Sequence, residues 1–139
     1  MQTNLSRLPF LYARATLGIA FLSGIADRFG LWRGRNAGYG NFDGFVKYTA
    51  KVNSFMPDSS ILFLAWAATI AELVLGIFLL LGIWPRWTAL ASALLLILFG
   101  MAMAISFGPK SPLDYSVFSA SAAAFLLAFN QGSTSSSEV

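Results

Sequence analysis

The residue with the clearest chemical potential is Glu72, the only ionisable residue in the apolar stretch 61–84. An ionised carboxylate in the middle of such a stretch is costly unless it has a partner. Arg14 lies inside another apolar stretch, and a rise of about 1.5 Å per helical residue brings its long side chain toward the depth of Glu72. We therefore expect an ion pair between Arg14 and Glu72.

Two interpretations of this pair stay open. As a structural pair, it would lock two helices together. As a functional centre, joined by Tyr12, it would hold a carbonyl or hydroxyl group of a ligand, or accept a proton, because ionisable residues at this depth usually mark sites. The residues of this centre do not define a catalytic reaction by themselves.

A second polar cluster is expected where two apolar stretches meet at one depth. Asp27 and Arg28 end the first stretch, and Asp114 and Tyr115 begin the last. Asp114 also suits the start of a helix, where free N–H groups and the helix dipole favour a carboxylate. A structural role alone would explain Asp114.

Composition limits the chemistry available to this chain. Of its 139 residues 57% are apolar and only 11% are charged, whereas an average globular domain is about 25% charged. The chain is therefore a membrane protein by composition. It has no cysteine and no histidine, which excludes thiol redox chemistry and the usual zinc, iron–sulfur and haem sites. A net charge of +3 is too small to indicate nucleic-acid binding.

Four stretches are long and apolar enough to be candidate membrane spans, each close to the roughly 20 residues that a spanning helix needs. They cover residues 10–26, 61–84, 87–107 and 113–130. Between the first two, apolar residues recur at helical spacing over about 41–56, which is typical of an amphipathic helix at the membrane surface. The sequence predicts an all-α membrane protein: a bundle of four transmembrane helices, with this interfacial helix between the first two spans.

The same pattern predicts one domain over residues 1–130, followed by a disordered polar tail at 131–139. Pro85 and Arg86 are expected to form the turn of a tight hairpin and to stop the preceding helix. Small residues should mark the packed faces. On the second span these are Ala65, Ala68, Thr69, Glu72 and Gly76, and on the fourth Ser116, Ser119, Ala120 and Ala123.

Four segments carry a family resemblance: ADRFGLWRG, YGNFDGFVKYTAKVNSFMP, LAWAATIAELVLGIFLLLGIWPRWTALAS and SPLDYSVFSASAAAFLL. With an arginine in the first span, the chain resembles the DoxX family of bacterial inner-membrane proteins. The resemblance implies a multi-pass protein of the cytoplasmic membrane, related to the small subunit of thiosulfate:quinone oxidoreductase. It places Arg14, Glu72, Gly76 and Asp114 on motif positions.

The resemblance implies an accessory subunit of a membrane oxidoreductase that binds a quinone or a similar lipophilic molecule. Arg14 or Tyr12 would donate to a quinone carbonyl, and Glu72 would handle a proton. Electrons would come from a redox-enzyme partner, because this chain lacks the residues that hold the usual redox metals. Besides the lipid bilayer, a second copy of the chain is a further expected partner. The alternative is a non-redox binding, chaperone or transport-like module with a structural Arg–Glu pair.

Overall fold

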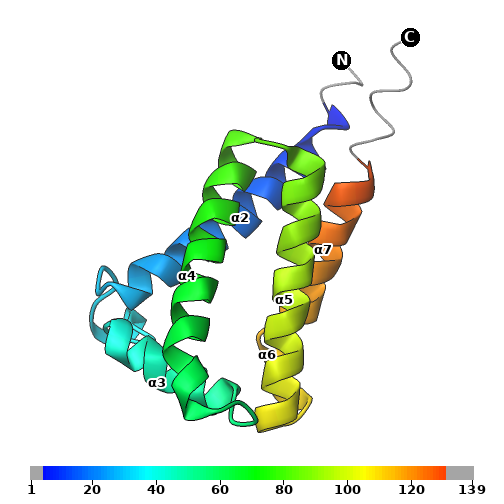
Figure 1. The fold of residues 1–139 in the computed structure, drawn as a ribbon. Helices are drawn as coiled ribbons and strands as arrows, with labels where there is room; N and C mark the ends of the chain where they lie inside the picture. Colours follow the sequence, from blue (N-terminus) through cyan, green and yellow to red (C-terminus); the bar gives the residue numbers. More distant parts are fainter. Residues whose placement is uncertain (1–4, 131–139) are drawn as a thin grey trace.

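The computed structural model describes residues 5–130, and the regular elements of this part of the chain are all helices, without strands (Figure 1). The helices are α2 (Leu8–Arg28), the short 3-10 helix η1 (Gly34–Asn36), α3 (Phe42–Val52), α4 (Asp58–Leu81), α5 (Pro85–Phe107), α6 (Lys110–Asp114) and α7 (Val117–Asn130). The all-α prediction is confirmed for these residues. The tail predicted at 131–139 lies outside them.

Three helices, α2, α4 and α5, are long and apolar enough to cross a membrane, and α7 is a shorter apolar helix. Large apolar side chains lie exposed along these helices, as in Phe63 of α4, which is 73% exposed, and Leu98 of α5, which is 66% exposed. A lipid-facing surface has this character, because lipid tails are as apolar as the side chains. The chain is a multi-pass membrane protein. The fourth span and the interfacial position of α3 stay predictions.

The bundle consists of two closely packed antiparallel pairs, α2 with α4 and α5 with α7 (Figure 1). In the first pair the backbones meet at Gly18 and Gly76. A methyl group added at Gly18 would come within 3.0 Å of the Gly76 carbonyl oxygen and 2.8 Å of a Leu80 side-chain carbon. These two glycines therefore fix where along their lengths α2 and α4 cross.

The predicted small-residue face of α4 is the buried face, although Ala68 at its edge is only half-buried. Its buried positions fall three or four residues apart, which is one side of a helix; they are Ile61, Ala65, Thr69, Glu72, Gly76 and Leu79. On α5, Ala89 and Ala93 are fully buried in the same way. In lipid, such faces allow close contact between helices and hold them together by packing.

The hairpin between α4 and α5 is formed differently from the prediction. Gly82 ends α4 in a left-handed conformation with φ 73°, and the N–H groups of Gly82 and Ile83 both donate to the Phe78 carbonyl oxygen. Pro85 is the first residue of α5. Proline suits this position because the first residues of a helix have no carbonyl partner for their N–H groups.

The fourth apolar stretch is interrupted rather than continuous. Residues Lys110–Asp114 form α6, and Ser116 takes a positive φ of 56° before α7 begins at Val117. Ser116 therefore lies outside α7, and the buried face of α7 is not the predicted one. It consists of Ser121, Ala124, Leu127 and Ala128.

Helix α3 packs against the first part of α4, which lies beyond the end of α2. Arg28, the last residue of α2, touches Thr69, which lies about 16 Å along α4 from its start at Asp58. Helix α3 packs against that first part of α4, with the rings of Phe42 and Trp66 4.4 Å apart. The predicted helix at 41–56 is thus present over Phe42–Val52.

Candidate functional site

Glu72 forms a buried ion pair with Arg28. The two residues are 6% and 4% exposed, and Nη2 of Arg28 contacts Oε2 of Glu72. The other terminal nitrogen, Nη1, donates to the Thr69 hydroxyl at 3.0 Å. The guanidinium carbon lies 3.7 Å from the centre of the Phe45 ring of α3. Three elements therefore enclose one charge pair, which satisfies the requirement that a buried carboxylate have a partner.

This ion pair keeps one unused donor. Among residues 5–130, Nε of Arg28 has no hydrogen-bond acceptor, although it is buried. A buried donor without an acceptor costs about 1–3 kcal/mol. The centre is therefore not a fully satisfied network.

The predicted pairing of Arg14 with Glu72 is wrong. Nε of Arg14 donates to the Leu79 carbonyl oxygen at 3.1 Å, and the guanidinium lies beside Gly82. The last four carbonyl groups of a helix lack helical partners and carry partial negative charge, so they are a natural partner for a cation. Tyr12 is 73% exposed on the outside of α2 and does not join Glu72.

The predicted second cluster is split in three. Arg28 faces α4, while Asp27 faces the loop after α2, because successive helical residues point about 100° apart. The Asp27 carboxylate accepts hydrogen bonds from the N–H groups of Gly38 and Tyr39, each at 3.0 Å, and so ties this loop to α2. Asp114 is the last residue of α6, and its carboxylate forms an exposed ion pair with Lys110 at 2.6 Å. Tyr115 is 74% exposed.

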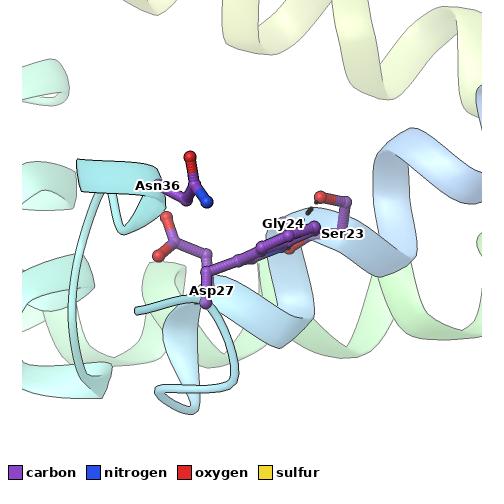
Figure 2. A pocket seen from close by; sticks show the side chains of 5 residues that line it. Ser23, Gly24, Asp27 and Asn36 are labelled. Carbon is purple, nitrogen blue, oxygen red and sulfur yellow. Dashed lines mark hydrogen bonds between the residues drawn. The ribbon is translucent and has the colours of Figure 1, made fainter. Parts of the chain in front are cut away.

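Two hollows share Asp27 as a wall. The smaller hollow, of about 340 Å³, is lined by Ser23, Gly24, Asp27, Trp32 and Asn36 (Figure 2). The larger hollow, of about 680 Å³, lies toward α3 and brings Asp27 together with Tyr115. Both volumes fall in the range of roughly 300–1,000 Å³ that is usual for small-molecule sites.

The smaller hollow combines an aromatic ring with polar groups. Trp32 donates its indole N–H to the Ser23 hydroxyl oxygen at 3.0 Å, so the Ser23 hydrogen stays available for donation. The Asn36 amide also lines the hollow (Figure 2). Gly24 connects this hollow to the ion pair, since a methyl group at Gly24 would lie 3.9 Å from Oε2 of Glu72.

The sequence predicted Thr69 only as a packing residue of α4, and it gave no indication that Phe45, Trp32 and Asn36 would lie at the site. The register of α2 against α4 could have revealed the Arg28 pair, because Gly18 and Gly76 are the positions at which the two backbones can meet most closely. Counting outward from that crossing brings Arg14 to the end of α4 and Arg28 to the neighbourhood of Glu72 and Thr69. The loop residues carried no comparable signal.

The family model described as DoxX matches residues 10–107, which include α2 from its third residue onward and the whole of α3, α4 and α5. No curated protein and no solved structure matches the chain.

Proposed function

The chain belongs to the DoxX family, and on this basis we propose that it is an accessory subunit of an oxidoreductase system of the bacterial cytoplasmic membrane. In this role it binds a quinone or a similar lipophilic molecule. The smaller hollow is the site that supports this proposal best. Its aromatic ring, its hydrogen-bond donors and its closeness to a buried carboxylate are what a quinone head group requires.

Each part of the hollow has a role toward a quinone. The Trp32 indole offers a flat surface against which the ring can stack. The Ser23 hydroxyl and the Asn36 amide can each donate to a quinone carbonyl. The buried ion pair of Glu72 and Arg28 adds an ionisable group beside Gly24. These roles replace those expected of Arg14 and Tyr12, which lie elsewhere.

Reduction of a quinone requires two electrons and two protons. The chain contains no cysteine or histidine to hold the usual redox metals, so a partner enzyme supplies the electrons in this proposal. The chain then contributes the quinone site. Asp27 lines the hollow, but its carboxylate already accepts hydrogen bonds from Gly38 and Tyr39, so in this proposal the Glu72 carboxyl beside Gly24 exchanges the proton.

The experiment compares Trp32→Leu with Trp84→Leu, a matched substitution at the opposite end of the bundle, where Trp84 is 69% exposed. Protein purified in mild detergent is extracted with organic solvent, and its quinone content is measured by chromatography. We expect Trp32→Leu and Asn36→Leu to lower the retained quinone at least tenfold and Trp84→Leu to leave it unchanged.

Equal retention by all variants would remove the hollow as the site. Absence of quinone from the wild type, together with no binding of an added short-chain quinone, would overturn quinone binding itself. The redox partner is tested by copurification from native membranes, where we expect a protein with flavin or metal absorbance.

The second candidate is a non-redox binding, chaperone or transport-like module. The observation in its favour is the enclosure of the Arg28 guanidinium by Glu72, Thr69 and Phe45, because a structural pair needs no ligand. In that case Glu72→Gln lowers stability without changing retention of any lipophilic molecule, and no redox enzyme copurifies.

A further inference from the structure

The larger hollow has a chemistry that the quinone site does not use. It lies between α3, the C-terminal part of α5 and the start of α7, and it opens at the same end of the bundle as the loop after α2. Lys47 and Lys51 of α3 line it, together with Tyr39, Tyr48 and Tyr115. Its lining is therefore cationic and phenolic, whereas that of the smaller hollow contains no cation.

The two lysines are available to a ligand. They are four residues apart on α3, so they lie on one side of the helix. In the part of the chain that the structure describes, the ion pairs join Arg28 to Glu72 and Lys110 to Asp114, so neither Lys47 nor Lys51 takes part in one.

The one acidic group in the wall does not cancel this charge. The Asp27 carboxylate accepts three hydrogen bonds from the backbone N–H groups of Gly38 and Tyr39, which offset much of its negative charge. Asp43 lies one turn before Lys47 on α3 but is not part of the hollow. Two lysines thus face one carboxylate that already has hydrogen-bond partners.

The tyrosines add neutral donors. The rings of Tyr39 and Tyr48 lie 5.3 Å apart, and Tyr48 also lies 6.3 Å from the Phe107 ring of α5. Burial raises the pKa of Tyr39 to about 12, and burial followed by the nearby Tyr115 raises the pKa of Tyr48. Both phenols therefore keep their hydrogens at neutral pH and can donate to an anion.

We propose that the larger hollow binds a phosphate group, held by Lys47 and Lys51 and by the hydroxyls of Tyr39 and Tyr48. Lysine binds phosphate as a compact positive charge, and phosphate oxygens accept several hydrogen bonds at once. Either an anionic lipid headgroup or a free phosphate compound carries this group. The proposal is independent of quinone binding, because it uses a different hollow and different residues.

The experiment uses delipidated full-length protein in a non-ionic detergent. Short-chain phosphatidylglycerol and inorganic phosphate are titrated separately, and binding is followed by native mass spectrometry and by the thermal unfolding midpoint. The test variant is Lys47→Gln/Lys51→Gln. The matched control is Arg33→Gln/Arg35→Gln, which removes the same charge from exposed residues that do not line the hollow.

We expect saturable binding of at least one probe by the wild type, a loss of at least tenfold in affinity for the lysine variant, and a change of less than twofold for the arginine control. Binding of phosphatidylglycerol alone identifies a lipid headgroup as the source. Binding of inorganic phosphate, with competition against the lipid, identifies a free phosphate compound. Lys47→Arg/Lys51→Arg should restore binding, which shows that charge rather than helix structure is responsible.

Two results would overturn the proposal. One is the absence of saturable binding of either probe by wild-type protein with native circular dichroism. The other is an equal loss of affinity in the lysine and arginine variants, which would mean that overall positive charge attracts the probe. Tyr48→Phe sharpens the test, because it removes one hydroxyl and keeps the ring.

Discussion

Arg14 and Arg28 lie near opposite ends of α2, and both reach across to α4, but they meet different kinds of partner. Arg14 is half-buried and donates to the Leu79 carbonyl oxygen at the end of α4. Arg28 is buried and faces the Glu72 carboxylate. The free carbonyl groups at the end of a helix can accept hydrogen bonds from water or lipid headgroups when the cation is removed. A buried carboxylate that loses its cation has no such replacement partner. The Arg28–Glu72 contact should therefore contribute far more to the free energy of unfolding than the Arg14–Leu79 contact.

The largest expected effect follows removal of the Arg28 charge. Arg28→Met leaves the Glu72 carboxylate buried without its ion-pair partner, and breaking a buried pair in this way costs about 3–5 kcal/mol. Unfolding by SDS in mixed micelles, followed by circular dichroism, measures the loss. Arg28→Met/Glu72→Met should recover most of it, because an apolar replacement of both charges removes the unpaired acid. A double variant as unstable as the single one would show that the loss arises from packing.

The next largest effect is expected at the crossing of α2 and α4, where Gly18 meets Gly76. This crossing determines which part of α4 each of the two arginines reaches. In Gly18→Ala the new methyl group meets the Leu80 side chain at 2.8 Å and the Gly76 carbonyl oxygen at 3.0 Å, so the helices must separate. Overpacking of this kind costs about 1–3 kcal/mol. Gly24→Ala is the control, because its methyl group would meet only Oε2 of Glu72, at 3.9 Å. The same unfolding assay should show a much smaller change there.

A smaller effect is expected at the other end of α2. Arg14→Met removes one hydrogen bond from a charged donor to a carbonyl oxygen, and because Arg14 is only half-buried we expect the lower end of the range for such bonds, about 1.5 kcal/mol. The free energy of unfolding should fall by that amount, well below the loss for Arg28→Met. Equal losses for the two variants would contradict the comparison of the two arginines.

The last effect leaves stability at neutral pH unchanged: it is a dependence on alkaline pH near the Arg28 end of α2. Tyr39 has its pKa raised from 10.0 to about 12, chiefly by burial. Its phenol therefore stays protonated in the folded protein at a pH where the unfolded chain has lost that proton. Stability from Tyr39 is present below pH 10 and decreases as the pH rises from 10 toward 12. Absorbance at alkaline pH should show a late phenol ionisation that is absent from Tyr39→Phe.

Much of the fold could be predicted from residue patterns. The buried face of α4 follows from its small residues, and α3 follows from apolar residues at helical spacing. The packed face of α7 could not be predicted from small residues, because residues 119–124 are all serine or alanine and small residues therefore lie on every side of the helix.

The candidate site was predicted only in part. Glu72 was expected to be buried with a basic partner, and this is so, but the partner is Arg28 instead of Arg14. Arg14 was predicted as the partner because the depth of each residue in the membrane was counted from the ends of the apolar stretches. That count holds only if neighbouring helices begin and end at the same depth. The crossing at Gly18 and Gly76 shifts α2 along α4, so the end of α2 lies beside the interior of α4.

The order of these partners along the chain has a consequence for biosynthesis. Thr69 follows Arg28 by 41 residues, and Glu72 comes slightly later still. A chain made from its N-terminus therefore presents the guanidinium to the bilayer before the acid that neutralises it has been translated. We therefore expect α2 to insert more stably once α4 has been made, and a nascent chain truncated before Glu72 to show weaker insertion of the first helix.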